Sequence, residues 1–149
     1  MTHEDNTHPV LDQALRFGRG LRDPLFLALV ALGAVAFALP RPHAGITVGA
    51  LLFKAAVEET VFRLGVQDTL AHVLPAGKHL PLSSANVAAA VLFAALHLIA
   101  HPPLWAALTF APSIAFGLTW DRHRSLPLCI LLHFIYNILY FHRPFSVPT

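Results

Sequence analysis

Two adjacent carboxylates, Glu58 and Glu59, lie with Arg63 inside a segment that is otherwise mostly apolar, residues 44–66. Ionisable groups are costly to keep at membrane depth, so such a group is a functional-site hypothesis by default. On a helix, Glu59 and Arg63 are four positions apart with the acid first, the favourable order for an ion pair. Glu58 points about 100° away from Glu59 around the helix. We therefore predict that Glu59 and Arg63 form a structural pair and that Glu58 is available for chemistry.

Lys54 adds a fourth ionisable group to this segment. It precedes Glu58 by four positions, so it is within reach of that carboxylate, although the base-first order is the weaker one. The alternative interpretation of the segment is that all four charged side chains form only a network that holds helices together.

Two histidines and an asparagine also lie inside apolar runs. His97 ends the run Leu92-Phe-Ala-Ala-Leu-His97, and His133 precedes Asn137 by four positions, which places the latter two on one helical face. A single histidine within a membrane often makes only a hydrogen bond between helices. Together with Glu58, however, the set provides a base, an imidazole that can hold a water molecule and two donors for an oxyanion. Hydrolysis of an amide needs these groups.

The composition is that of an integral membrane protein. Of the 149 residues, 56% are hydrophobic and 12% are charged, and the mean hydropathy is +0.61. In soluble domains, roughly 45–50% of the residues are hydrophobic and about 25% are charged. The length suffices for one domain. A formal net charge of +2, spread along the chain, argues against nucleic acid as a partner. The single cysteine, Cys129, cannot form an internal disulfide.

Five apolar runs predict an all-α, polytopic transmembrane helical bundle with about five spans. The runs are residues 24–39, 44–66, 85–100, 104–120 and 126–141. The first has about the minimum length for a helix that crosses a bilayer. Because Ala36-Phe-Ala38 resembles a cleavage site, a signal peptide is the alternative for this run. Pro112 predicts a kink in the fourth run.

Polar segments frame these runs. Residues 1–23 are predicted to be a cytoplasmic lead-in that includes a surface helix, and residues 142–149 a short tail. The membrane domain then comprises residues 24–141. Residues 67–84 have a mixed composition, which predicts an interfacial loop or a short amphipathic helix, and Ser83 or Ser84 is suited to cap the helix that follows.

The positive charges predict the orientation in the membrane. With five spans and a cytoplasmic N-terminus, only Arg41 and Arg143 fall on the outer side. This distribution agrees with the positive-inside rule. The composition, rich in Ala and Arg and poor in Lys, suits a high-GC bacterium, so the bacterial inner membrane is the predicted location. The cytoplasmic basic residues are Arg16, Arg19, Arg22, Lys78, Arg122 and Arg124.

Three short motifs follow one another in separate apolar runs, namely Glu58-Glu59-x-x-x-Arg63, Phe93-x-x-x-His97 and His133-x-x-x-Asn137. In this order they resemble the motifs of the CPBP family of intramembrane peptidases (CAAX protease and bacteriocin-processing, also called ABI). The resemblance covers about residues 44–141. Two features differ from the family pattern. Five spans are fewer than well-studied members have, and Leu64 follows the arginine where many members have glycine.

The resemblance implies a role for each motif residue. Glu58 and His97 would activate the attacking water molecule. His133 and Asn137, on the last span, would hold the oxyanion. Glu59 and Arg63, the predicted ion pair of the second span, would support the site. No cofactor is implied. The implied substrate is a membrane-anchored protein or peptide, for example one with a C-terminal sorting tail or a CAAX-like tail.

These observations predict a glutamate-dependent intramembrane endopeptidase. Two alternatives keep the membrane bundle: a catalytically inactive peptide-binding or immunity protein of the same fold, and a small transporter or proton relay that uses the same buried groups. A further alternative is a zinc site formed by Glu58, His97 and His101, but Pro102 disfavours helical geometry at His101. The sequence leaves the substrate undecided, and both monomer and oligomer remain open.

Overall fold

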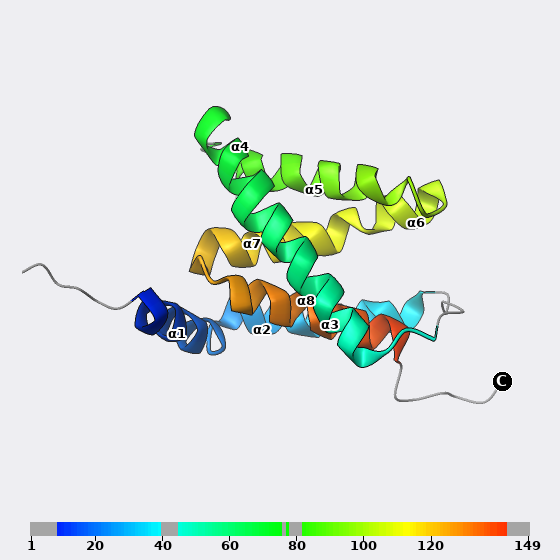
Figure 1. Ribbon diagram of the computed structural model, residues 1–149, viewed down its shortest axis with the longest axis horizontal. Helices are drawn as coiled ribbons and strands as arrows, with labels where there is room; N and C mark the ends of the chain where they lie inside the picture. The colour runs from blue at the N-terminus through cyan, green and yellow to red at the C-terminus, as the bar shows by residue number, and fades with distance from the viewer. Residues whose placement is uncertain (1–8, 40–44, 76, 78–81, 143–149) are drawn as a thin grey trace, which may run out of the picture.

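The computed structural model describes residues 9–39, 45–75, 77 and 82–142, and the regular elements within these ranges are all helices. The all-α part of the predicted fold is therefore confirmed. In chain order the elements are α1 (Pro9–Gly20), α2 (Pro24–Leu32), the 3₁₀ helix η1 (Gly33–Ala38), α3 (Val48–Glu59), the π-helix η2 (Thr60–Gln67), α4 (Asp68–Val73), α5 (Ser84–His97), α6 (Pro103–Leu108), α7 (Phe110–His123) and α8 (Leu126–Phe141) (Figure 1).

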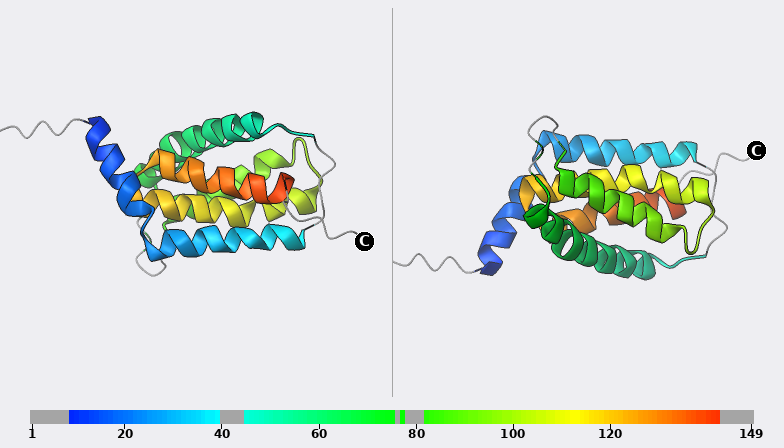
Figure 2. Two further views of the ribbon diagram at one scale, coloured as in Figure 1. Left: turned by 90° about the horizontal axis from the view of Figure 1, so that it is seen from below. Right: turned by 90° about the horizontal axis from the view of Figure 1, so that it is seen from above.

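The chain passes back and forth between two ends of a bundle (Figure 2). At one end, Nε of Arg122, on the last turn of α7, donates to Oδ2 of Asp23 at 2.6 Å, and Asp23 is the N-cap of α2. At the other end, the indole N–H of Trp105 in α6 donates to the hydroxyl of Tyr140 in α8 at 3.0 Å. We call these the charged end and the aromatic end.

α4 and the start of α5 also lie at the charged end. Arg124 forms an ion pair with Asp68, the first residue of α4. Ser83 caps α5, as predicted, by accepting a bond from the N–H of Asn86 at 3.0 Å, and its hydroxyl donates to Asp121 at 2.7 Å. Successive passes of the chain therefore run in opposite directions, as the predicted alternation of spans requires.

The second pass is longer than the sequence predicts. Instead of ending near residue 66, the helix continues through η2 and α4 to Val73. No proline occurs between Glu59 and Pro75, so nothing in this stretch prevents the backbone from remaining helical. The predicted interfacial segment, residues 67–84, therefore begins as helix.

The fourth pass is divided rather than simply kinked. It breaks at Thr109 into α6 and α7. Pro112 cannot donate to the carbonyl of Leu108, and its ring would clash with that carbonyl in a continuous helix. The break therefore falls one turn before the proline that predicts it.

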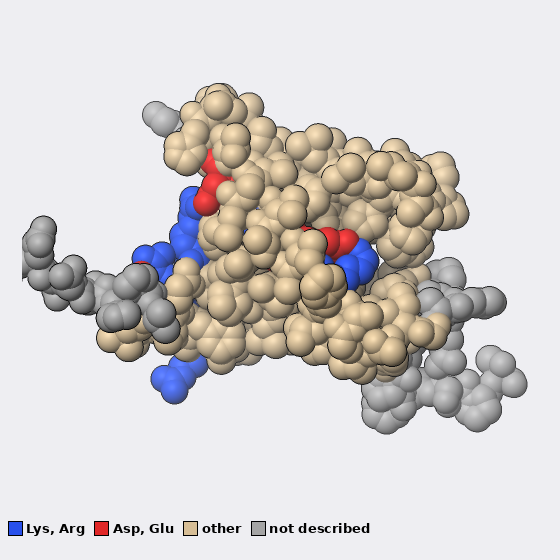
Figure 3. Space-filling model, viewed as in Figure 1, with Lys and Arg blue, Asp and Glu red and all other residues tan. Residues whose placement is uncertain are grey.

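The core joins α2, α7 and α8, and its buried members are Phe26, Leu29, Ala115, Phe116, Leu128 and Leu132. Many large apolar side chains lie on the outside instead; Phe53, Leu104 and Ile99 are 71%, 75% and 83% exposed. In Figure 3 the charged residues gather at the charged end and in one smaller patch, and most of the visible face is uncharged.

Within the described residues, no single helix is both long and apolar enough to cross a membrane by itself. The pair Leu11–Gly20 and Pro24–Ala38 meets the criteria when taken together, with a bend of 66° between its halves. The apolar helices Ser84–His97 and Leu126–Phe141 are shorter.

Candidate active site

Glu58 and Glu59 are the last residues of α3, and the helix then widens into the π-helix η2. A π-helix bonds each N–H to the carbonyl five residues back, as the N–H of Asp68 does with the carbonyl of Arg63. Short π segments inside α-helices are frequent at functional sites. Glu59, Arg63 and Gln67 follow one another at steps of four, and all three are at most 1% exposed.

Glu59 and Arg63 form the ion pair that their spacing predicts. Nε of Arg63 lies 3.0 Å from Oε2 of Glu59, and both side chains are fully buried. The other oxygen of Glu59, Oε1, lies 2.8 Å from Nδ1 of His133 on α8. One oxygen of Glu59 therefore contacts Arg63 on η2 and the other contacts His133 on α8. These two contacts hold α3, η2 and α8 together.

Sequence reasoning missed the residues that hold the far side of Arg63. Its guanidinium donates to Oε1 of Gln67 at 2.5 Å and to the hydroxyl of Ser113 at 3.2 Å. The amide of Gln67 in turn donates to the carbonyl of Gly117 at 3.2 Å and to Asp121 at 2.8 Å. The signal available in the sequence was the four-residue step from Arg63 to Gln67. Ser113 and Asp121 carry no comparable signal.

Gly117 permits the close approach of α7 to this network. A Cβ atom at this position would lie 2.7 Å from a guanidinium nitrogen of Arg63 and would overlap the side-chain oxygen of Asn86. Asn86, on α5, is fully buried and donates to the carbonyl of Ile114 at 3.2 Å. The missing side chain of Gly117 therefore makes room for two polar groups from neighbouring helices.

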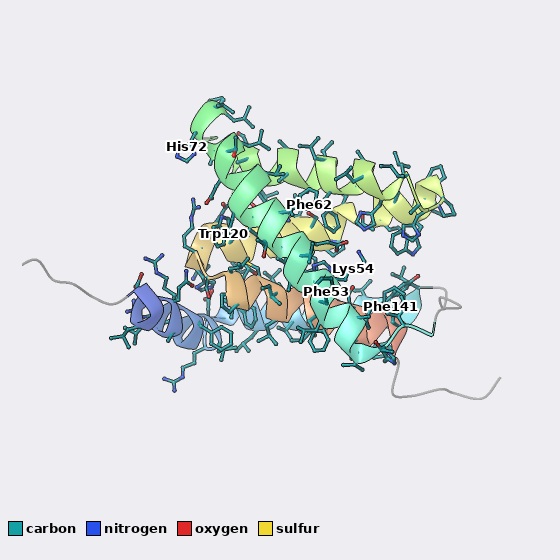
Figure 4. All side chains as sticks on the ribbon, in the orientation of Figure 1. Phe53, Lys54, Phe62, His72, Trp120 and Phe141 are labelled. Carbon is teal, nitrogen blue, oxygen red and sulfur yellow. The ribbon has the colours of Figure 1, made fainter. Side chains whose placement is uncertain are left out.

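Glu58 faces a different environment from Glu59. Its side chain is 21% exposed and forms an ion pair with Lys54, whose side chain is 41% exposed. Both residues line an open pocket of about 310 Å³. Figure 4 labels Lys54 on α3, and the smaller charged patch of Figure 3 lies in the same part of the view. The residues that line the pocket are Lys54, Val57, Glu58, Val61, Phe62, Phe93, Leu96, His97, Ala100 and His101.

His97 reaches the same pocket from α5. Its Nδ1 lies 2.8 Å from the carbonyl of Phe93, which accepts the Nδ1 proton, so Nε2 is the nitrogen left for a water molecule or a substrate. The ring packs against Phe93 and Trp105, with centroids 4.5 Å and 5.6 Å away. The structure thus brings Glu58 and His97 to one pocket.

His133 lies between the two carboxylates and is 5% exposed. Besides its contact with Glu59, its Nε2 lies 3.5 Å from Oε2 of Glu58. The ring of Phe116 stacks on the imidazole at a centroid distance of 4.5 Å and an angle of 15°. His133 does not line the pocket, and of its two carboxylate partners only Glu58 does.

Asn137 lies one turn beyond His133 on α8. Its Nδ2 is buried and has no hydrogen-bond partner among the residues that the structure describes. An unpaired buried donor costs free energy, and such groups are rare in folded proteins. Asn137, like His133, does not line the pocket.

His101 follows His97 outside the helix, as the adjacent proline predicts. α5 ends at His97, and the two imidazole rings are stacked with centroids 5.9 Å apart. In the described part of the chain, no group of three or more His, Cys, Asp or Glu side chains is arranged to hold a metal ion. Leu64, which differs from the family pattern, is 47% exposed.

The family model of the type II CAAX prenyl endopeptidase Rce1-like proteins matches residues 24–139, which is most of the chain. The chain belongs to this Rce1-like family. The match confirms the resemblance to the CPBP and CAAX proteases on which the sequence interpretation depends. Rce1-like proteins are membrane-embedded proteases, so membership supports peptidase activity for this chain in general terms. No curated protein and no solved structure matches this sequence.

Proposed function

We propose that this Rce1-like chain is a glutamate-dependent endopeptidase of the membrane that cleaves a membrane-anchored protein or peptide. One observation carries the proposal: of two adjacent carboxylates, Glu59 is fully buried in an ion pair, whereas Glu58 lines an open pocket together with His97. A general base must reach the proton that it removes. Glu58 meets that requirement, and Glu59 does not.

In the proposed mechanism, Glu58 and Nε2 of His97 hold a water molecule, and Glu58 accepts its proton as the oxygen attacks the peptide carbonyl. The developing oxyanion accepts hydrogen bonds from Asn137 and His133. The unpaired Nδ2 of Asn137 supports this role, because the donor has no other partner among the described residues. Glu59 and Arg63 keep α3, η2 and α8 in register around the site.

The substrate in this proposal ends in an apolar C-terminal tail of the CAAX type. Apart from Glu58, Lys54 and the histidines, the pocket is lined by aliphatic and aromatic side chains, which suit an apolar peptide segment. Because both the pocket and the surrounding helices present apolar surface, a membrane-anchored substrate can approach without leaving the bilayer.

The proposed placement is a bundle of five passes, residues 24–141, with the charged end in the cytoplasm. Exposed apolar side chains on α2, α3, α5 and α6 suit a lipid environment. The charged end holds Arg122 and Arg124 and lies next to α1, which carries Arg16 and Arg19 (Figure 1). Of the other residues in the orientation argument, Lys78, Arg41 and Arg143 lie outside the described residues.

The test uses the purified full-length protein in proteoliposomes with a library of membrane peptides that includes CAAX-type C-termini. Glu58→Gln keeps the size of the side chain but removes the base, so cleavage should fall by about 10²–10⁴. Asp12→Asn makes the same chemical change on α1, where the carboxylate is half exposed, and should have no effect.

Three results would contradict the proposal. Near-normal turnover by Glu58→Gln would show that Glu58 is not the base. Loss of wild-type cleavage on addition of a chelator would point to a metal. Peptide binding without cleavage would favour the inactive peptide-binding alternative.

A further inference from the structure

His133 contacts both carboxylates, and it uses a different ring nitrogen for each. Nδ1 lies 2.8 Å from Oε1 of Glu59, and Nε2 lies 3.5 Å from Oε2 of Glu58. No other described side chain joins the buried ion pair to the carboxylate that lines the pocket. This position suits a group that transfers protons rather than one that only binds an oxyanion.

The protonation of the ring follows from its partners. Glu59 is paired with Arg63, and an ionised carboxylate only accepts hydrogen bonds, so Nδ1 of His133 carries a proton. In the neutral ring, Nε2 then has a lone pair and can accept a proton but cannot donate one. A neutral His133 therefore cannot bind an oxyanion through Nε2, whereas the imidazolium can.

We propose that His133 carries the proton of the attacking water from Glu58 to the leaving nitrogen, with Glu59 as the positioning residue for its ring. This inference rests on the proposed peptidase function. It assigns to His133 a step that neither the sequence motifs nor the oxyanion role includes.

The water oxygen forms a bond to the carbonyl carbon while Glu58 takes one water proton. Glu58 passes a proton to Nε2 of His133, which gives an imidazolium beside the Glu59 carboxylate. Nε2–H then donates to the oxyanion and transfers its proton to the amide nitrogen as the carbon–nitrogen bond breaks. The products are a carboxylic acid and an amine, and Glu58 and His133 return to their starting states.

The surroundings of His133 favour this role. Glu59 stabilises the imidazolium and fixes which nitrogen faces Glu58, as a carboxylate does behind a catalytic histidine. The stacked ring of Phe116 restrains the orientation of the imidazole, at 4.5 Å between centroids. Both carboxylates already lie within 3.5 Å of the ring, so a small approach of Glu58 completes the hydrogen bond along which the first proton moves.

The test compares two leaving groups. The acyl half of a library peptide that the wild-type protein cleaves is prepared as a 4-nitroanilide and as a 4-nitrophenyl ester. The anilide needs a proton on its leaving nitrogen, whereas phenolate leaves without one. His133→Gln can still donate a hydrogen bond but cannot carry a proton. We expect it to lower anilide hydrolysis by about 10²–10⁴ and to lower ester hydrolysis by a much smaller factor, because glutamine replaces the hydrogen bond but not the proton transfer.

Asn137→Ala is the matched control on the same helix. Loss of a pure oxyanion donor should lower both rates by a similar factor, about 10²–10³. Equal losses of anilide and ester hydrolysis in His133→Gln would overturn the proton transfer while leaving the peptidase function intact. Failure of the wild-type protein to cleave any peptide would instead overturn the proposed function.

Glu59→Gln provides a second variant in which His133 itself is unchanged. The amide oxygen still accepts from Nδ1 but no longer stabilises an imidazolium. Anilide hydrolysis should again fall more than ester hydrolysis. If the role of Glu59 is only structural, both rates should fall by the same factor, and that result would overturn the positioning role. This comparison decides the matter even if His133→Gln fails to fold.

Discussion

At the scale of single residues, the environment separates the two neighbouring glutamates. Both belong to the last turn of α3, yet Glu59 is fully buried between Arg63 and His133, and Glu58 is partly exposed beside Lys54. A buried carboxylate with an ionic or hydrogen-bonding partner for each oxygen is held in one place. A carboxylate at the wall of a pocket can exchange partners, which proton transfer requires.

Arg63→Ala should lower stability as well as activity. Removing one partner of a buried ion pair leaves an uncompensated charge and costs roughly 3–5 kcal/mol. Denaturant unfolding of the protein in detergent measures this loss. Arg16→Ala is the matched control, because Arg16 pairs with Asp12 at the same spacing but both side chains are exposed, so the loss should stay below about 1 kcal/mol.

A double variant tests whether Glu59 and Arg63 are a pair. Glu59→Gln combined with Arg63→Leu removes both charges and should regain part of the stability that Arg63→Ala loses. Recovery should be incomplete, because Gln67 and Ser113 still lose a partner. A double variant as unstable as Arg63→Ala would contradict the pairing.

At the scale of elements, α7 connects the candidate site to the charged end. Its inner face supplies Ser113 and Asp121 to the network around Arg63, and its last turn supplies Arg122 and His123 to Asp23. The position of α7 is thus fixed at two places, by the network around Arg63 and by the contact with Asp23. The contact with Asp23 can be tested without changing any proposed catalytic residue.

The contact between Asp23 and Arg122 predicts a pH dependence. The guanidinium of Arg122 holds the pKa of Asp23 below its usual value of 3.8. A carboxyl pKa that is lower in the folded state adds stability above pH 3.8, and this contribution is lost as the pH falls through the folded value.

Asp23→Asn tests this dependence, because asparagine caps a helix as well as aspartate but carries no charge. The wild type should be the more stable at neutral pH, and the difference in melting temperature should shrink as the pH falls below 3.8. Thermal unfolding in detergent across this range measures it. A difference that stays constant with pH would show that the charge of Asp23 does not stabilise this contact.

At the scale of the whole molecule, charge is distributed very unevenly. Ion pairs cluster at the charged end, and the candidate site is a second, isolated group of charges on a largely apolar exterior (Figure 3). A chain of contacts, buried up to Gln67, runs between the two through Glu59, Arg63, Gln67 and Asp121. Such a surface suits a protein whose outside faces lipid and whose charged end faces water.

The orientation can be tested with single cysteines in a Cys129→Ala background. Arg19→Cys lies on the exposed part of α1 at the charged end, and Pro102→Cys lies in the exposed turn between α5 and α6 at the opposite end. A membrane-impermeant maleimide should label the first only from the cytoplasmic side and the second only from the outside. Reversed labelling would overturn the cytoplasmic N-terminus.

The helices and the side-chain pairs within one helix follow from the amino-acid sequence. Helix periodicity places Glu59 beside Arg63 and Lys54 beside Glu58, and both pairs are present. Ser83 and Pro112 mark a helix start and a break for reasons of backbone hydrogen bonding, which depend only on neighbouring residues. The family assignment is equally local, since it depends on three short motifs in order, and the family model confirms it.

The groups that meet across helices do not follow from the sequence pattern, because they depend on how the helices pack. The contacts of His133 with Glu58 and Glu59 join positions 74 or more residues apart, and those of Arg63 with Ser113 and of Gln67 with Asp121 join α7 to η2. The spacing of residues along one helix fixes a face but not its neighbour. Packing against that neighbour selects the partners, because a buried polar group must find a hydrogen bond wherever the adjoining helix provides one.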